Sequence, residues 1–254
     1  MPGGQAIPSF GHQRLRFTAG QQRAWEQDWA RLGHEVAELL DGDEAYDPPT
    51  WFGRTAPLVL EIGSGMGEST AAMAATAPDV DHLAVEVFEP GLAQLLMRIT
   101  EADLSNLIPL RGDAVALLTR AVPVGSLTGI RIYFPDPWPK RRHHKRRLVQ
   151  PAFVALAASR LRPGGTLHLA TDWDHYAKQM RTVCNAEPLL EAQPGDDGWT
   201  PRPPWRPLTK FEQRAHREGR TVRDLIYVRN AGPAPARPLE VGDPGKSYAS
   251  GRSN

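Results

Sequence analysis

The chain has 254 residues, of which 41% are hydrophobic and 23% are charged. This balance is typical of a globular protein with one large domain or two small ones. It has no run of about 18 apolar residues, and residues 1–16 lack the apolar core of a secretory signal, so we expect neither a transmembrane helix nor export. Thirty Lys and Arg residues against 29 Asp and Glu residues leave a net charge of +1, so any nucleic-acid signal must be local. Cys184 is the only cysteine, which excludes internal disulfides and thiolate zinc sites and favours a cytoplasmic location.

The two ends of the chain differ in composition from its middle. Residues 231–254 carry four prolines among Gly, Ala and Ser, a composition that predicts a disordered tail. Residues 1–17 predict a flexible arm, made basic by Arg14 and Arg16. Between them, residues 18–230 predict a single domain.

The domain opens with a predicted helix. Thr18 is followed by Gln21 at the spacing of a capping box. Further apolar residues recur at helical spacing and predict one continuous face packed into the core: Trp25, Trp29, Leu32, Val36 and Leu39.

From Leu58 onward, short apolar runs alternate with helical patterns. The predicted strands are Leu58–Ile62, His82–Val87, Leu107–Leu110, Gly129–Phe134, Thr166–Thr171 and Leu225–Arg229. The predicted helices are Glu68–Ala77, Pro90–Ala102, Ala114–Arg120, Arg146–Leu161 and Asp174–Glu187. This alternation predicts an α/β fold with a mostly parallel, doubly wound sheet covered by helices on both faces. Residues 191–208 interrupt it with five prolines and two glycines, as a long functional loop would.

The first predicted strand ends in a glycine-rich turn that indicates a nucleotide site. Gly63 and Gly65 would let the backbone approach a ligand closely. The dinucleotide fingerprint needs a third glycine at position 68, where Glu68 stands. Glu61, just before the turn, would hold an ammonium group but repel a pyrophosphate. These residues favour S-adenosylmethionine over NAD.

Two more acids follow the next two strands. Glu86 ends the second strand, where a carboxylate accepts hydrogen bonds from ribose hydroxyls. Asp113 follows the third strand, where it could read an adenine amino group or simply cap the following helix. The coincidence of Glu61, Glu86 and Asp113 at successive strand ends predicts a cofactor site in the crevice of the sheet.

A proline-rich segment and a basic run follow the fourth strand. Three prolines at positions 135, 137 and 139 would hold Asp136 and Trp138 rigidly. Trp138 could stack on a base or pack beneath the loop. Residues 140–147 contain six fixed positive charges in eight positions, which suits binding to a phosphate backbone; a solvated helix face is the alternative.

These motifs resemble those of the bacterial tRNA (guanine-N7)-methyltransferases. The nearly diagnostic block is Phe-Pro-Asp-Pro-Trp-Pro-Lys-Arg-Arg-His-His-Lys-Arg-Arg at 134–147, and the glycine turn is Leu-Glu-Ile-Gly-Ser-Gly-Met-Gly at 60–67. Further matches are Leu-Arg-Pro-Gly-Gly at 161–165, Thr-Asp-Trp at 171–173 and Thr-Lys-Phe-Glu at 209–212. The resemblance runs from about Ser9 to Arg229. It implies a Rossmann-like class I methyltransferase fold and methyl transfer from S-adenosylmethionine to N7 of guanine 46 in the tRNA variable loop.

The resemblance also implies a role for each matching position. The cofactor-binding residues would be Glu61, Gly63, Gly65, Glu86, Asp113 and Asp136, with Asp136 also the catalytic acid. The substrate-binding residues would be Lys140, Asp172, Thr209, Lys210, Phe211 and Glu212. The RNA-binding residues would be Arg142, His143, His144, Lys145, Arg146 and Arg147. We expect tRNA as partner, no metal and no membrane, with monomer and homodimer both open.

Two other functions compete with this interpretation. An amino methyltransferase would use an Asp-Pro-Pro-aromatic motif after the fourth strand, to which Asp136-Pro137-Trp138 is closely similar; the basic run and the Thr-Lys-Phe-Glu block argue against it. An RNA-binding protein built on an inactive methyltransferase fold would not need an intact Glu61, glycine turn and Asp136.

Overall fold

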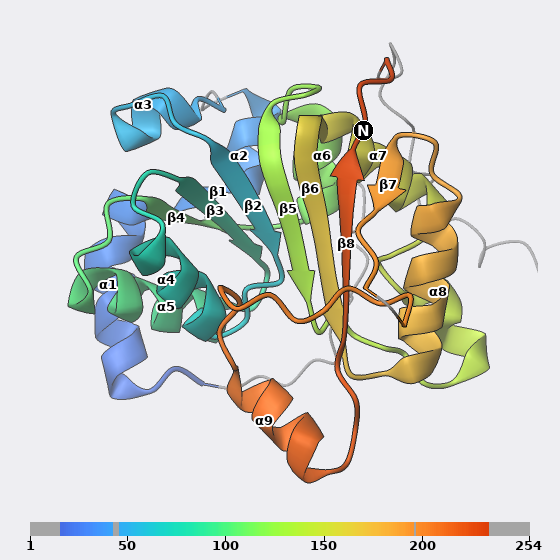
Figure 1. Cartoon of the computed structure of the whole chain (residues 1–254). Coiled ribbons are helices and arrows are strands. Elements are labelled where there is room, and N and C mark those ends of the chain that lie inside the picture. Colours follow the sequence, from blue (N-terminus) through green and yellow to red (C-terminus); the bar gives the residue numbers. More distant parts are fainter. Residues whose placement is uncertain (1–15, 43–45, 196, 234–254) are drawn as a thin grey trace, which may run out of the picture.

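The computed structural model describes residues 16–42, 46–195 and 197–233. These residues build one eight-stranded sheet in the order β1-β4-β3-β2-β5-β6-β8-β7 (Figure 1). The strands are β1 (His34–Glu35), β2 (Leu58–Ile62), β3 (Asp81–Glu86), β4 (Leu107–Arg111), β5 (Leu127–Tyr133), β6 (Leu161–Thr171), β7 (Leu190–Ala192) and β8 (Arg223–Arg229). The pairs from β1 to β6 are parallel, and β8 is antiparallel to both β6 and β7. The predicted mostly parallel sheet is confirmed.

Helices cover both faces of this sheet. They are α1 (Ala19–Leu32), α2 (Val36–Asp41), α3 (Pro48–Phe52), α4 (Glu68–Thr76), α5 (Glu89–Glu101), α6 (Ala114–Arg120), α7 (Pro151–Arg160), α8 (Asp174–Asn185) and α9 (Lys210–Arg217), with the 3₁₀ turn η1 (Arg141–Arg146). Along β3, Leu83 and Val85 belong to the apolar cluster shared with α6, α7 and α8, whereas Ala84 belongs to the cluster shared with α4 and α5. Because neighbouring strand residues point to opposite faces, the two clusters lie on opposite sides of the sheet.

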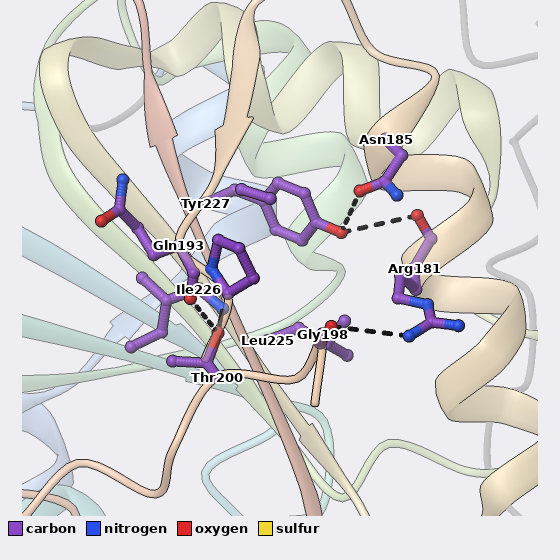
Figure 2. A pocket seen from close by; sticks show the side chains of 10 residues that line it. Arg181, Asn185, Gln193, Gly198, Thr200, Leu225, Ile226 and Tyr227 are labelled. Carbon is purple, nitrogen blue, oxygen red and sulfur yellow. Dashed lines mark hydrogen bonds between the residues drawn. The ribbon is translucent and has the colours of Figure 1, made fainter. Parts of the chain in front are cut away.

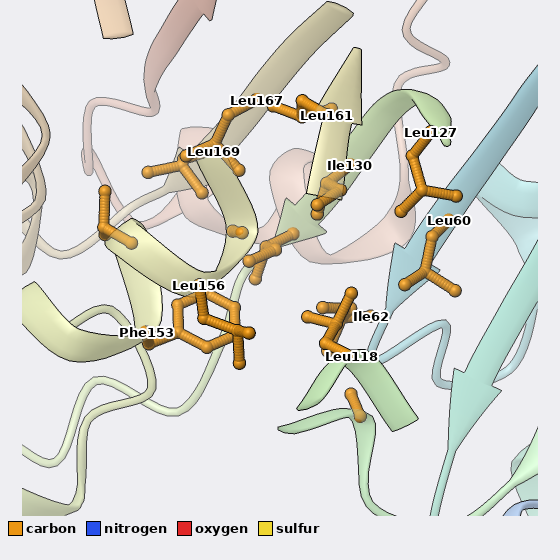
Figure 3. Packing of buried hydrophobic residues seen from close by; sticks show 14 of the residues in the cluster. Leu60, Ile62, Leu118, Leu127, Ile130, Phe153, Leu156, Leu161, Leu167 and Leu169 are labelled. Atoms are coloured by element: carbon orange, nitrogen blue, oxygen red, sulfur yellow. The ribbon is translucent and has the colours of Figure 1, made fainter. Parts of the chain in front are cut away.

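The larger cluster forms the main core (Figure 3). Leucine and isoleucine side chains of the central strands meet the helical residues Leu118, Phe153 and Leu156 there, and nearly all of these side chains are inaccessible to solvent. Burial of this kind is worth about 1.5–3 kcal/mol per large apolar side chain. The core therefore fixes the central strands, whose carboxyl ends carry the predicted acids.

Most predicted helices agree with the structure to within two residues at each end, but two differ by more. The first was expected to continue past Leu32, but α1 ends there and the chain turns at Gly33, where an added Cβ would lie 2.5 Å from the Trp29 ring. The single apolar face is therefore wrong: Val36 and Leu39 belong to the separate helix α2, while Trp25 and Trp29 stack on each other at 4.4 Å and stay only partly buried. The other helix was expected from Arg146 but begins at Pro151, because proline suits a first helical turn and disfavours helix in the residue before it.

The predicted arm and tail lie outside the described residues, apart from residues 16–17 and 231–233. Within the described ranges, no helix combines the length and the apolar character needed to cross a membrane.

Candidate active site

A cavity of about 480 Å³ opens at the carboxyl ends of the central strands, within the size range of small-molecule sites. It is lined by residues 61–69, 85–87, 112–115 and 132–136 together with Trp138, Arg146, Leu148, Thr209 and Phe211. Segments that are far apart in the sequence therefore meet at one site. Those that follow β2, β3, β4 and β5 come together because parallel strands end at the same edge of the sheet.

The glycine turn has the backbone geometry that close ligand approach requires. Gly63 and Gly65 have φ angles of 78° and 55°, in the left-handed region, and a Cβ at either position would point into open space. The Gly63 amide donates to the Val85 carbonyl at 2.8 Å and the Gly67 amide to the Ser64 carbonyl at 2.9 Å. The turn is thus fixed, and its open side forms part of the cavity wall.

Glu61 lines the cavity and has an unsatisfied carboxylate oxygen. Its side chain is only 5% exposed, and Oε2 has no hydrogen-bond partner among the described residues. Burial raises the pKa of Glu61 to about 7, against the lowering effect of Arg131. A cationic ammonium group would supply the missing partner, so this residue fits the amino-acid part of S-adenosylmethionine.

Glu86 also lies on the cavity wall, as the sequence predicted. Its carboxylate accepts from the backbone amides of Gly65, Val87 and Phe88 at 2.9, 2.7 and 3.0 Å. Burial raises the pKa of Glu86, and these three hydrogen bonds oppose the rise. A carboxylate can accept about four hydrogen bonds, which leaves room for a ribose hydroxyl.

Asp113 lines the same cavity from the end of β4. Its carboxylate caps α6 by accepting from the Val115 amide at 2.8 Å. The helix-cap role is therefore confirmed, and a contact with adenine stays a prediction.

Asp136 lies on the cavity from the β5 side. Its segment is conformationally unusual, since Phe134 and Trp138 have φ angles of 51° and 43° without being glycines. The guanidinium of Arg147 holds the segment by donating from Nε to the Pro137 carbonyl at 2.8 Å. Asp136 keeps an exposed carboxylate, and partial burial raises its pKa. Asp136 therefore lines the cavity, and its contact with the cofactor stays a prediction.

The basic run divides into an exposed part and a buried residue. Lys140, Arg142 and Arg146 are exposed, with Arg146 lying over the Trp138 ring at 5.0 Å. His143 packs against the same ring edge-on at 5.9 Å. Trp138 is thus partly covered by two side chains of the basic turn and also lines the cavity, so both packing and base stacking stay predictions. Partial desolvation and the neighbouring cations lower the pKa of His143 and His144.

Arg147 corrects the prediction that the whole run contacts RNA. Its side chain is 2% exposed and points inward, away from solvent. Besides Pro137 it contacts Gln179 Oε1 at 2.5 Å and His175 Nδ1 at 3.1 Å, and it lies 4.7 Å from the Tyr176 ring centre. Nε and Nη1 of this guanidinium support the Asp136 segment and α8, and Nη2 is buried without a partner among the described residues, so the group is not exposed to a phosphate.

The Thr-Lys-Phe-Glu block is also divided. Thr209 and Phe211 line the cavity, Phe211 with 68% of its surface exposed, and Lys210 is exposed beside them. Glu212 is fully buried and bound to Arg206 and Arg202, so it does not face a substrate. The Glu212 amide donates to Thr209 Oγ1 at 3.3 Å, which makes the block the N-terminal cap of α9. The Thr-x-x-Glu spacing could have revealed this unpredicted helix.

Asp172 does not line the cavity, and neither do the other predicted substrate residues Lys140, Lys210 and Glu212. The Asp172 carboxylate pairs with Arg220 at 3.0 Å. Sequence reasoning missed Tyr133 and Leu148 on the cavity wall, and it also missed Arg206; no spacing pattern in a single sequence singles these residues out.

A second hollow of about 390 Å³ lies between α8 and the β7–β8 edge (Figure 2). It shares no lining residue with the first cavity. Its polar groups bond one another: the Tyr227 hydroxyl donates to Asn185 at 2.7 Å and Thr200 Oγ1 to the Gln193 carbonyl at 2.8 Å. Among the described residues, those lining this hollow therefore include no buried unsatisfied group comparable to Glu61.

The strand order, the glycine turn and the acids at successive strand ends define a class I methyltransferase, whose cosubstrate is S-adenosylmethionine. Solved structures agree on the fold: the 16S rRNA methyltransferase KamB matches with a TM-score of 0.54 at 16% identity, over 74% of this chain and 95% of that one. The antibiotic-resistance methyltransferase Kmr matches with a TM-score of 0.51 at 16% identity, over 74% of this chain and 93% of that one. A protein-family model described as "Putative methyltransferase" matches residues 55–225.

Similar sequences narrow the class to a family. The tRNA (guanine-N(7)-)-methyltransferase of Nocardia farcinica is 51% identical, over 87% of this chain and 83% of its own length. Proteins of the same name from Streptomyces avermitilis and Alcanivorax borkumensis are 49% and 46% identical, over 88% and 89% of this chain and 75% and 92% of their own lengths. The chain belongs to the tRNA (guanine-N7)-methyltransferase family.

Proposed function

We propose that this protein transfers the methyl group of S-adenosylmethionine to N7 of guanosine 46 in the variable loop of cytoplasmic tRNA. The observation that carries the proposal is the composition of one cavity. Glu61, Glu86 and the glycine turn form one wall, which we call the cofactor wall. The segment that follows β5 forms another, the substrate wall, and carries Asp136 next to the exposed basic turn of residues 141–146. The names of the relatives give guanine as the base that they methylate and N7 as the atom that receives the methyl group.

The chemistry needs little acid–base assistance. S-adenosylmethionine supplies an electrophilic methyl group on a sulfonium, and guanine N7 offers a lone pair without a proton to remove. The chain's residues must therefore orient the base and stabilise the positive charge that it acquires. The Asp136 carboxylate, exposed on a rigid segment of the cavity wall, is the group suited to this role.

The exposed cations beside Asp136 suit a polyanionic substrate. Arg142, Lys145 and Arg146 lie on the turn that directly follows the Asp136 segment, so RNA phosphates bound there would bring a nucleotide to the cavity mouth. Phe211 also lines the cavity and has a more exposed ring than the partly covered Trp138, so it is the better placed of the two to stack on a base.

The position can be tested with two tRNA transcripts that differ only at nucleotide 46. Each transcript is incubated with labelled S-adenosylmethionine, and methylated sites are mapped by reduction and strand cleavage at 7-methylguanosine. We expect label and cleavage at position 46 when it is guanosine, and neither when it is adenosine. Equal labelling of both transcripts would contradict the assignment to guanosine 46.

A further inference from the structure

A buried ion-pair network lies behind the Thr209–Phe211 part of the cavity mouth, and the methyl-transfer chemistry itself does not use it. At its centre is Arg206, 1% exposed, in the proline-rich segment that precedes α9. Its Nε and Nη2 donate to Asp224 Oδ1 and Oδ2 at 2.8 and 2.9 Å. Its Nη1 and Nη2 donate to Glu212 Oε2 and Oε1 at 2.6 and 3.0 Å. One guanidinium thus joins a carboxylate of β8 to a carboxylate of α9.

The network continues from Asp224 to the strand that leads to Asp136. Asp224 Oδ1 lies 2.7 Å from His168 Nε2, and His168 Nδ1 lies 2.9 Å from the Tyr133 hydroxyl. Burial lowers the pKa of His168, so a neutral ring can donate to Asp224 and accept from Tyr133. Tyr133 ends β5, lines the cavity and is three residues from Asp136. One chain of hydrogen bonds therefore connects α9 with the catalytic side of the cavity.

Few other contacts attach α9 to the rest of the molecule. Its buried residues are Glu212 and Ala215, and in Figure 1 the helix lies outside the layers that cover the sheet. Thr209 and Phe211, which line the cavity, are three positions and one position before Glu212. The position of both depends on how firmly Glu212 is held, because an exposed helix of eight residues is not stable without such attachment.

We propose that Arg206 is a positioning residue for methyl transfer: by joining Glu212 to Asp224 it fixes Thr209 and Phe211 at the mouth of the cavity where the target nucleotide enters. The inference rests on the proposed function. Arginine is required because its planar fork serves two carboxylates with paired hydrogen bonds. A lysine would offer a single point charge and would leave one buried carboxylate without a full set of partners.

The test compares Arg206→Lys with a matched control, Arg160→Lys. Arg160 is another buried arginine, but it donates to the Leu118 and Thr119 carbonyls and Ser159, none of which lines the cavity. For Arg206→Lys we expect kcat/KM for tRNA to fall by on the order of 100-fold, the scale of a misplacement of about 1 Å. Affinity for S-adenosylmethionine, measured by calorimetry, should stay within about threefold, because the glycine turn and its acids are untouched. Arg160→Lys should lower the melting temperature without changing kcat/KM.

A double mutant separates positioning from general destabilisation. If Arg206 acts through the mouth of the cavity, Phe211→Ala added to Arg206→Lys should cost less than the two separate losses in kcat/KM multiplied together. Glu212→Gln, which keeps the side-chain shape and one acceptor oxygen, should show the same loss and decides the question if Arg206→Lys does not fold.

Wild-type kcat/KM in folded Arg206→Lys or Glu212→Gln would overturn the inference, as would an equal loss in Arg160→Lys. Failure of the proposed function looks different: the wild-type protein would then form no 7-methylguanosine, whatever stands at position 206.

Discussion

The two walls of the cavity use charged residues in different ways. On the cofactor wall, Glu61 and Glu86 are both buried. On the substrate wall, Asp136 and Arg146 are exposed and line the cavity, whereas the buried Arg147 holds the Asp136 segment through the Pro137 carbonyl. A small molecule can be surrounded by buried groups, whereas a folded RNA can reach only side chains at the surface. On the substrate wall, we therefore expect exposed residues to bind RNA and buried residues to support the fold. On the cofactor wall, we expect the buried residues themselves to bind the ligand.

Asp136 is the group proposed to stabilise the charge that develops on the methylated base, so its substitution gives the largest expected effect. Asp136→Asn keeps the size of the side chain and removes its charge. Turnover should fall by on the order of 10²–10³, the scale for one preorganised electrostatic group. Asp174→Asn, which removes an exposed carboxylate on α8, serves as the control and should leave single-turnover rates unchanged. Wild-type turnover in Asp136→Asn would show that the charge of Asp136 does not contribute to catalysis and that the residue has only a structural role in the turn.

Glu86 tests the cofactor wall. Glu86→Ala should weaken S-adenosylmethionine binding by about 1.5–3 kcal/mol, the range for a hydrogen bond to a charged group. Glu89→Ala, three residues further along and exposed, is the matched control and should bind normally. If calorimetry finds equal affinities for the two folded variants, Glu86 does not bind the ribose of S-adenosylmethionine.

Variants of the basic turn test directly whether its exposed residues bind RNA while the buried Arg147 supports the fold. Arg142→Glu combined with Arg146→Glu should weaken tRNA binding and reduce its salt slope, by about 0.7–0.9 for each phosphate that the turn no longer neutralises. Arg147→Gln should instead lower thermal stability and leave the salt slope of the remaining tRNA affinity unchanged, because its guanidinium binds Pro137 and Gln179. A reduced salt slope in Arg147→Gln would show that burial does not separate the two roles.

The smallest expected effect is a pH dependence of cofactor affinity and of stability, caused by Glu61. Burial raises its pKa to about 7, so the ionised form that can pair with an ammonium group increases as the pH rises through that value. Affinity for S-adenosylmethionine should therefore increase up to roughly tenfold between about pH 6 and about pH 7.5. Stability of the ligand-free protein changes in the opposite sense: it decreases as the pH rises from the ordinary pKa of 4.5 to about 7, since the raised pKa favours the protonated folded state. Glu61→Gln should remove both trends; a wild-type-like pH profile in that variant would assign them to another group.

Sequence reasoning succeeded where local pattern determines structure. The runs at β2 and α6 predicted the observed bounds because a buried parallel strand and a capped helix are encoded in adjacent residues. It failed where a tertiary contact decides. Arg146 and Arg147 are neighbours of the same type, yet one is exposed and the other buried, because the partners at positions 137, 175 and 179 surround only the second. Local patterns likewise did not predict that Arg206 binds the carboxylates of Glu212 and Asp224, which lie six and 18 residues away along the chain.

The most direct measurement is the identity of the product nucleoside. Unmodified tRNA is incubated with the wild-type protein and S-adenosylmethionine labelled in the methyl group, digested to nucleosides and separated. We predict that the label appears in 7-methylguanosine, and that Asp136→Asn lowers its rate of appearance without changing its identity. Label in a nucleoside methylated on an exocyclic nitrogen, or cofactor binding without any transfer, would contradict this prediction.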